Sequence, residues 1–227
     1  MGTVLVAIVI VPSAPVLVPE LAGAAAAETA DLREAVLTAA AVLPDRWTAI
    51  GAGATDALWG PQAAGTFAGF GVDVAVGLSP QADRRTELAL CALITGWIRG
   101  QVRPGAHADV HSFASADDAP ARGRALRAAI DADPEPIGVL VVADGCNTLT
   151  AAAPGGHDPD SEAVQAALDD ALAAGDTAAL GALPAGVVGR AAFAVLAGLA
   201  GPAAHEATEL YRGAPFGVGY AVDLWRP

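Results

Sequence analysis

Uninterrupted runs of aliphatic residues are the feature that most constrains the fold of this chain. Residues 4–11 and 137–143 are almost entirely Val, Ile, Leu and Ala, without the polar alternation expected of a strand that has one solvated face. Such runs are typical of strands covered on both faces by helices. They therefore favour a sheet enclosed between two helical layers.

Helical patterns alternate with strand patterns along the chain. Apolar residues recur at helical spacing over five segments, and four further strand patterns occur. This alternation predicts one domain, residues 1–227, built as a three-layer α/β/α sandwich around a mostly parallel, mixed sheet. Because alanine makes up about a quarter of the residues, we expect closely packed backbones. The predicted helices are 20–42, 84–99, 117–132, 161–174 and 188–200, and the additional strands are 47–51, 72–77, 108–113 and 216–224.

The charge balance argues against two classes of partner. The chain has 12 Arg, no Lys and 25 Asp and Glu, which gives a formal net charge of −13. Nucleic acids and anionic membranes attract basic surfaces, so we expect neither as a partner. No basic segment precedes the apolar run at residues 4–11, and the two cysteines lie far apart. These features favour a cytoplasmic protein without a signal peptide or a disulfide framework.

Three loops follow the carboxyl ends of predicted strands, where ligands bind in parallel α/β sheets. They comprise residues 12–19, 51–60 and 144–160. Asp144 has a structural role to play even without a ligand, because a carboxylate at a strand end accepts backbone N–H groups. The candidate site residues in these loops are Ser13, Asp56, Asp144, Asn147 and His157.

Three segments also carry a joint family resemblance. Residues 12–20 (PSAPVLVPE) resemble a Pro-His-Pro-Pro-Leu-Leu-x-Pro-Glu loop, and residues 143–150 (ADGCNTLT) with 153–159 (APGGHDP) resemble a Gly-Asp-x-Ser-His-x-Leu loop followed by Gly-Tyr-Asp-Pro. Residues 214–220 (APFGVGY) are similar to a closing Ala-Pro-Phe-Gly-Val-Gly-Tyr strand. All three are motifs of the class III extradiol ring-cleavage dioxygenases of the B type, whose superfamily includes Memo-like proteins. The chain most resembles an alanine-rich actinobacterial branch.

The resemblance implies the fold of the B-type extradiol dioxygenases, whose members carry an iron site. Family members open a catechol ring with dioxygen on a mononuclear Fe(II) held by two His and a carboxylate, with another His as acid–base. Here Ser13 stands at the first metal-binding His, residues 51–56 (GAGATD) replace a Ser-Pro-His, and Asn147 replaces the acid–base His. Arg212 stands near the position of a Glu. Hydroxyl and amide groups substitute poorly for imidazole on iron, so the usual iron site is expected to be lost.

Two functions from different classes follow from the resemblance. The first is a non-catalytic or functionally diverged binding protein with no cofactor, a small-molecule partner and a vestigial pocket formed by the five loop candidates. Homo-oligomerisation through the alanine-rich helices is compatible with it. The second is an Fe(II)-dependent extradiol dioxygenase of a catechol-type aromatic with an unconventional ligand set. That set is Asp56, Asp144, His157 and His205.

A third function is a metal-independent hydrolase. Its nucleophile is Ser13 or Cys146, and His157 with Asp158 or Asp144 supplies the base and the orienting carboxylate. No Gly-x-Ser-x-Gly elbow is present. For Cys146, at the end of a buried strand, the simpler interpretation is a small apolar filler.

Other polar residues have plainer interpretations. His107 and His111 are four residues apart, but on a strand that spacing spans about 13 Å. His205 with Glu206 and Glu209 is expected on a solvated helix face. Residues 51–53 (GAG) fail as a phosphate loop because Asp56 replaces a glycine. Glycines at 217 and 219 are expected to allow close packing of the last strand.

Overall fold

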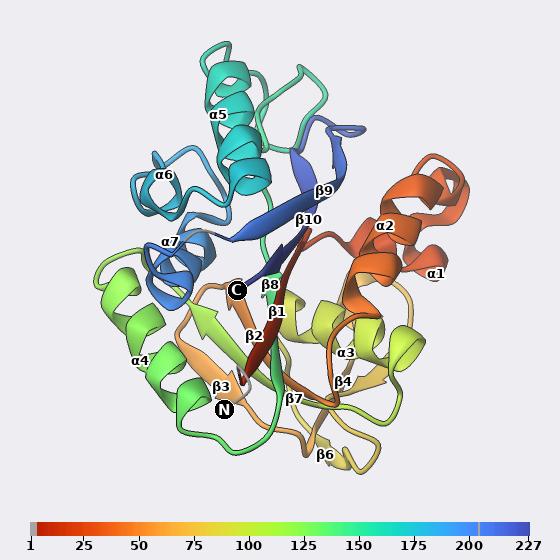
Figure 1. Ribbon diagram of the computed structural model, residues 1–227. Helices are drawn as coiled ribbons and strands as arrows, with labels where there is room; N and C mark the ends of the chain where they lie inside the picture. The colour runs from red at the N-terminus through yellow and green to blue at the C-terminus, as the bar shows by residue number, and fades with distance from the viewer. Residues whose placement is uncertain (1–3, 204) are drawn as a thin grey trace.

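A computed structural model describes residues 4–203 and 205–227. Its centre is a seven-stranded sheet with the order β3-β7-β2-β8-β1-β10-β9, and helices cover both faces (Figure 1). The predicted three-layer α/β sandwich is therefore confirmed. The strands are β1 (Leu5–Val11), β2 (Arg46–Ala52), β3 (Ala57–Trp59), β7 (His107–Phe113), β8 (Ile137–Val142), β9 (Glu206–Gly213) and β10 (Tyr220–Arg226).

The sheet is parallel in its middle and antiparallel at both edges. β7, β2, β8 and β1 pair in parallel. β3 is antiparallel to β7, β10 to β1, and β9 to β10. The predicted closing strand at 216–224 begins later, at Tyr220, because the Gly-rich residues before it form a turn.

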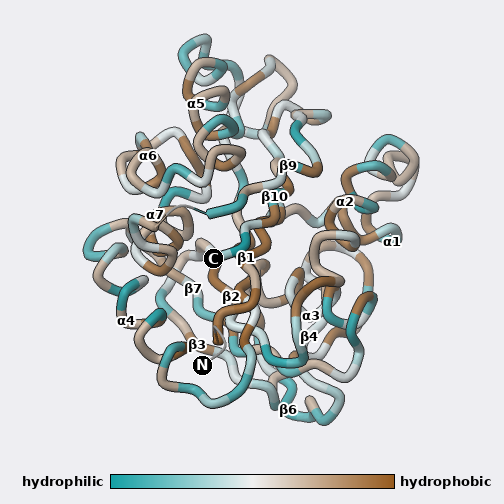
Figure 2. The backbone as a smooth tube through the Cα atoms, in the orientation of Figure 1, coloured by the Kyte–Doolittle hydropathy of each residue, from teal (hydrophilic) through white to brown (hydrophobic). Residues whose placement is uncertain are grey.

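Alternate residues of the central strands supply two separate cores. Val9 and Leu140 face the layer of α2 (Ala30–Ala40) and α3 (Leu90–Val102). Ile8 and Val139 face the opposite layer, which contains α4 (Ala119–Asp131), α5 (Ser161–Ala174), α6 (Thr177–Gly181) and α7 (Arg190–Ala200). All six residues of β8 are buried, as its unbroken aliphatic run predicts. The hydrophobic centre and the more polar periphery are visible in Figure 2.

Small residues allow helix backbones to touch. A Cβ placed on Gly123 of α4 would lie 2.1 Å from the carbonyl oxygen of Val195, and one on Gly198 of α7 would lie 2.1 Å from that of Pro120. Only glycine fits at such a crossing. The expectation of closely packed backbones is confirmed for this pair of helices.

A second, three-stranded sheet was not expected. It has the order β5-β4-β6 and comprises β4 (Ala63–Thr66), β5 (Ala75–Gly77) and β6 (Arg84–Arg85). The strand predicted at 72–77 thus belongs outside the main sheet. The helix predicted from residue 84 begins at Leu90, because residues 84 and 86 give their N–H groups to the carbonyls of Gln62 and Ala64.

Of two other helix predictions, one is confirmed only in part and the other is wrong. The segment 20–42 is divided into α1 (Pro19–Ala22), a 3-10 turn and α2, with Gly23 at a positive φ of 53° that ends α1. Residues 206–209, predicted as helical, belong to strand β9, because β10 is an antiparallel partner from Glu206 to Gly213, with one register shift. Tertiary pairing overrides local preference in such short segments.

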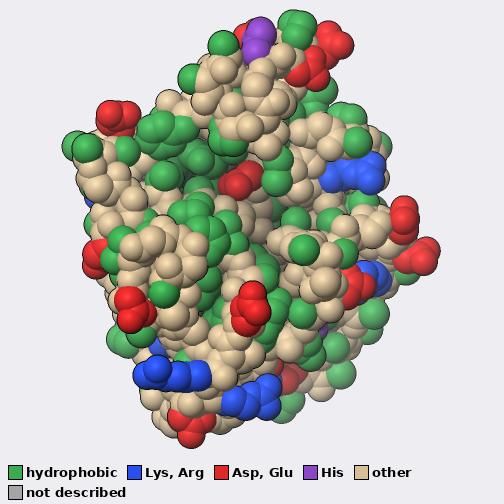
Figure 3. Space-filling view, turned by 180° about the vertical axis from the view of Figure 1, so that it is seen from behind, with side chains coloured by type: hydrophobic (Ala, Val, Ile, Leu, Met, Phe, Trp, Pro, Cys, Tyr) green, Lys and Arg blue, Asp and Glu red, His purple; other side chains and the backbone are tan. Residues whose placement is uncertain are grey.

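Surface charge and helix length are the two properties that concern nucleic-acid and membrane partners. On the face seen from behind, acidic side chains are dispersed and arginines form small groups, two of which lie near each other at the lower left (Figure 3). Within the described part of the chain, no helix has the length and apolar character needed to cross a bilayer.

Candidate functional site

Sheet topology brings the three candidate loops to one edge. β1, β8 and β2 are neighbours, with Val11 paired to Val142 and Val142 paired to Gly51. The loops after these strands therefore begin side by side at the carboxyl ends of the parallel strands. This is the edge at which open α/β sheets bind ligands.

Ser13 and Asp144 are in direct contact at this edge. The backbone N–H of Ser13 donates a hydrogen bond to Oδ1 of Asp144 at 2.8 Å. Beside it, the N–H of Ala143 donates to the carbonyl of Val11. Asp144 thereby ties the loop after β1 to the loop after β8, as expected. Burial raises the pKa of Asp144 to about 7, against the opposing effect of the Ser13 N–H. Near pH 7 the carboxyl exchanges a proton.

Tyr220 adds a buried phenol whose electrostatics are linked to Asp144. Its side chain is buried. Burial raises the pKa of Tyr220, and the charges of Asp144 and Tyr211 raise it further. The phenol is therefore a neutral hydrogen-bonding group at physiological pH. Sequence reasoning did not single out Tyr220, although it is the last residue of the segment APFGVGY.

Two glycines next to this edge leave space for the buried side-chain amide of Gln165. Gly145 donates its N–H to the carbonyl of Gly219, which in turn donates to that of Cys146. A Cβ on either glycine would lie 2.0–2.1 Å from Oε1 of Gln165. Gln165 is fixed in place, since it accepts the Cys146 N–H at 2.8 Å and donates to Oδ1 of Asp169 at 2.7 Å. The packing role expected of Gly219 is confirmed.

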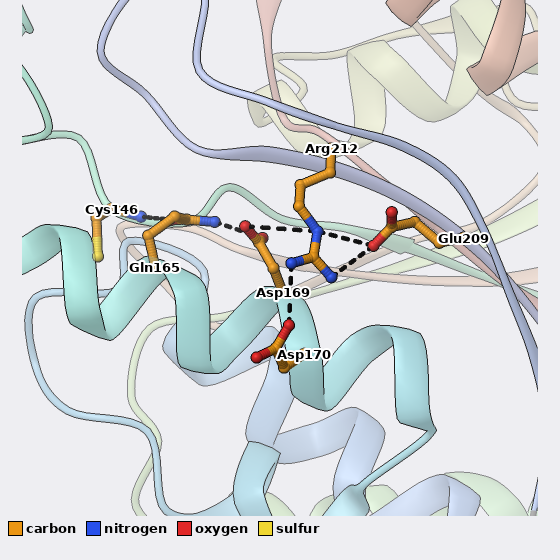
Figure 4. Close-up of polar contacts among 6 residues, drawn as sticks. All are labelled: Cys146, Gln165, Asp169, Asp170, Glu209 and Arg212. Atoms are coloured by element: carbon orange, nitrogen blue, oxygen red, sulfur yellow. Dashed lines mark hydrogen bonds and ion pairs between the residues drawn. The ribbon is translucent and has the colours of Figure 1, made fainter.

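The Gln165 amide leads into a charged cluster centred on Arg212 (Figure 4). Its guanidinium lies 3.9 Å from Asp169, 2.9 Å from Asp170 and 2.7 Å from Glu209. Asp169 is buried and the other two carboxylates are more exposed. Arg212 therefore joins β9 to α5. Arg212 was expected near the closing strand, but nothing in the sequence indicated its partners on the helix.

Asp223 is a buried carboxyl that sequence analysis also missed. It lies on β10 opposite Glu209 of β9 and is 1% exposed. Neither carboxyl oxygen has a hydrogen-bond partner among the described residues. Burial, followed by the charges of Glu209 and Asp169, raises the pKa of Asp223 to about 7, while Arg212 lowers it. The neutral form is the one that this environment favours.

Asp56 is held on the other side of β2, away from Asp144. It accepts the N–H of Ala114 at 2.9 Å and pairs with Arg122 at 2.9 Å. These two contacts lower the pKa of Asp56, the Ala114 N–H most strongly. Arg122 also stacks over the ring of Phe113 at 4.4 Å. Asp56 therefore joins the loop after β2 to β7 and α4.

Glycines in the other motifs also allow close packing. A Cβ on Gly51 would lie 2.3 Å from that of Cys91, and one on Gly53 would lie 2.2 Å from Oγ of Ser112. Gly217 has a φ of 70°, in the region that favours glycine. Residues 51–53 thus form the end of a packed strand, consistent with rejecting a phosphate loop.

The third loop folds back upon itself. The carbonyl of Asn147 accepts the N–H of Gly155 at 2.9 Å, and His157 forms an isolated antiparallel bridge with Leu149. His157 is exposed. Among the described residues, neither its ring nor the hydroxyl of Ser13 makes a hydrogen bond. The serine, histidine and aspartate proposed for a hydrolase are therefore not joined as a triad.

Cys146 is a buried thiol. Its side chain is completely buried. Burial, followed by the charge of Asp169, raises the pKa of Cys146, although the hydroxyl of Ser161 opposes this. Ser161 in turn shares a hydrogen bond of 2.6 Å with Thr148. A buried protonated thiol is a poor nucleophile, so the interpretation as a small apolar filler is confirmed.

The other histidines lie on strand β7 and just before strand β9. His107 and His111 are on strand β7, as expected. His111 stacks on Phe113, and burial lowers the pKa of His111. The ring of His205 stacks on Trp225 at 5.5 Å, and burial likewise lowers the pKa of His205. His205 precedes a strand, which corrects the helix expected there.

These residues do not fit an iron centre. Across residues 4–203 and 205–227, no three His, Cys, Asp or Glu side chains are grouped so that they could hold a metal ion. A facial triad needs two imidazoles and a carboxylate around one ion. In the unconventional set, Asp56 is paired with Arg122, Asp144 accepts the Ser13 N–H, and His205 stacks on an aromatic ring.

Comparisons with known proteins give a fold likeness. No protein-family model matches the chain, and no curated protein is found to be related to it. Among solved structures, the chain is similar to the uncharacterized protein JW3007 from Escherichia coli K12, with a TM-score of 0.56 and 12% sequence identity. The match covers 98% of this chain and 100% of that one. At this identity the likeness concerns the fold alone.

Proposed function

We propose that this chain is a diverged relative of the B-type extradiol dioxygenases that binds a small molecule and does not cleave an aromatic ring. The observation that carries the proposal is the set of groups at the sheet edge: Ser13 and Asn147 stand where the resemblance places imidazoles, and the carboxyl of Asp144 accepts the Ser13 N–H. The resemblance puts a metal-binding imidazole at residue 13, whereas here the side chain is a hydroxyl, which substitutes poorly for imidazole on iron. Asn147, at the position of the acid–base His, has an amide side chain that does not act as a general base near neutral pH, and its backbone carbonyl accepts the N–H of Gly155.

Electrostatics at the sheet edge support binding of a neutral or weakly polar ligand. Asp144, with a pKa of about 7, can donate or accept a hydrogen bond near neutral pH. A divalent cation prefers ionised oxygen ligands or imidazole, and the described residues offer no grouping of that kind. We therefore propose hydrogen bonding as the means by which this edge binds its ligand.

Metal content and metal response test the catalytic half of the proposal. Protein purified without oxygen is analysed for metals and then titrated with Fe(II), Zn(II) and Mn(II) in a thermal-shift assay, with oxygen uptake measured on catechols. We expect no stoichiometric metal, no saturable shift and no uptake. Stoichiometric Fe(II) with catechol-dependent oxygen uptake would show that the dioxygenase alternative holds.

The binding half is tested at Asp144. A library of small neutral polar compounds is screened by thermal shift against the unaltered chain, Asp144→Asn and Asp144→Leu. We expect saturable hits that weaken in Asp144→Asn, which cannot exchange a proton, and disappear in Asp144→Leu. Hits that bind all three forms equally would place the ligand elsewhere and contradict the proposal.

A further inference from the structure

A hollow lies at the end of the main sheet opposite the Ser13–Asp144 edge. A cavity of about 950 Å³ is lined by the three-stranded sheet, the last turn of α3 and the turn that follows it. The small sheet is attached to the start of β7, where the N–H of Ala108 donates to the carbonyl of Leu78. In Figure 1, β4 and β6 lie at the bottom, away from α1, which follows the carboxyl end of β1. The cavity is thus distinct from the Ser13–Asp144 edge.

Small side chains leave the hollow open. Its walls include Ala64 and Gly65 of β4, Ala75 of β5 and Ala82. A volume of this size is within the range of small-molecule sites, roughly 300–1,000 Å³. The cavity can therefore accommodate a metabolite-sized compound.

Arg99 gives this cavity a buried positive charge. Its side chain lines the hollow and is only 7% exposed. Nε donates to the carbonyl of Gly77 at 2.8 Å, and Nη1 donates to the carbonyls of Pro104 and Ala106. Carbonyl groups hold the guanidinium in position without neutralising it. Among the described residues no carboxylate lies within ion-pair distance of Arg99, and Nη2 has no hydrogen-bond partner.

A buried guanidinium without a counter-ion is unusual, because unpaired charge is costly to remove from water. Arginines in such positions typically meet carboxylates or phosphates. Arg85 lies at the exposed rim and adds a second positive charge. Asp73 and Asp83 are also on the exposed rim, and their charge disfavours a highly charged phosphate compound.

We propose that this cavity binds a small molecule through a single carboxylate, which pairs with Arg99 inside the hollow while Arg85 contacts the ligand at the rim. The site is separate from the function proposed for the sheet edge and does not depend on it. The ligand class is a small monocarboxylic acid whose body occupies the space beside Ala64 and Ala75.

Thermal shift and calorimetry with acetate, benzoate and glycine test the proposal, with chloride at equal ionic strength and inorganic phosphate as comparisons. We expect at least one carboxylate to give a saturable stabilisation that chloride does not reproduce. Absence of such an effect for every carboxylate would overturn the proposal. Phosphate binding as tightly as the best carboxylate would overturn the assignment of ligand class.

Variants locate the binding without depending on one fragile residue. Arg99→Gln should abolish binding, but it also removes contacts to three carbonyls. Ala75→Trp fills the cavity from an exposed strand position and leaves Arg99 intact, so it should abolish binding in a folded protein. Arg85→Gln should weaken binding roughly two- to fivefold, the effect of an exposed ion pair. Arg84→Gln is the matched control, because Arg84 is an exposed neighbour outside the lining. Equal affinities for the unaltered chain and Ala75→Trp, or equal effects at 84 and 85, would contradict the site.

Discussion

The N–H of Ser13 donates to the carboxyl of Asp144, a residue 131 positions further along the chain, at 2.8 Å. This bond joins the loops after two neighbouring parallel strands, β1 and β8. It fixes the geometry of the edge where a ligand is expected in this architecture. Substitutions of Asp144 therefore test whether this hydrogen bond stabilises the fold.

Replacing Asp144 should separate its role as an acceptor from its role as an acid. At about pH 5.5, where the carboxyl is mostly neutral, Asp144→Ala should lower the free energy of unfolding by about 1–3 kcal/mol, because the Ser13 N–H loses its partner. Asp144→Asn keeps an acceptor oxygen and should cost much less. Urea unfolding measures both, and equal losses would show that the hydrogen bond is not the stabilising element.

Asp223 should make the protein less stable as the pH rises. With a pKa of about 7 when folded and 3.8 as the ordinary value, the carboxyl binds more protons in the folded chain between these limits. Stability contributed by the neutral form is therefore lost as the pH rises from about 4 to about 7. At about pH 8, Asp223→Asn should raise the free energy of unfolding by on the order of 3 kcal/mol.

The gain from Asp223→Asn should shrink as the pH falls toward about 4, and urea titrations across this range measure it. Asp170→Asn is the control, because that carboxylate is exposed and paired with Arg212. It should give no gain at high pH. A pH-independent effect of Asp223→Asn would mean that Asp223 is not the titrating group.

Gly219→Ala should displace Gln165. The new Cβ would lie 2.0 Å from Oε1 of this amide, which is bonded to both Cys146 and Asp169. Overpacking and loss of these bonds should destabilise the chain by about 2–4 kcal/mol. Gly100→Ala, in a helix and with open space around its Cβ, should instead be neutral or stabilising. Thermal unfolding compares the two, and similar effects would refute the steric argument.

Both thiols should be unreactive in the folded protein. Cys91 and Cys146 are free and completely buried, and burial raises the pKa of Cys91 to about 11. An aromatic disulfide reagent should react with neither at neutral pH and with both in concentrated urea. Rapid labelling of Cys146 under native conditions, absent in Cys146→Ser, would revive the nucleophile hypothesis.

The sequence predicted the core of this fold well because its signals are local. The aliphatic runs of β1 and β8 identify strands covered on both faces, and the helix at 161–174 has the bounds of α5. The helix predicted over 205–209 is wrong because β9 becomes a strand only by pairing with β10. A pairing between two strands cannot be recognised from the sequence of one of them alone.

The site was only partly predictable for the same reason. The rule that ligands sit at strand ends placed Ser13 and Asp144 together. It could not place Gln165 against two glycines, or leave Asp223 without a partner, since both depend on packing between distant segments. Arg99, which lines the cavity beside the three-stranded sheet, is the last residue of the helix predicted over 84–99, and nothing in the sequence of that helix indicates that its guanidinium would be buried.

The strand order has a consequence for how the chain is made. Ile8 pairs with Trp225, so β1 gains its second neighbour only after all the residues between these two strands have been synthesised. Until then the hydrogen-bonding groups along one side of β1 are open to pairing with another chain. Contacts so distant in sequence also slow folding. We therefore expect the nascent protein to depend on protection by chaperones, and the fluorescence of the buried Trp225 to report the pairing of β10 with β1.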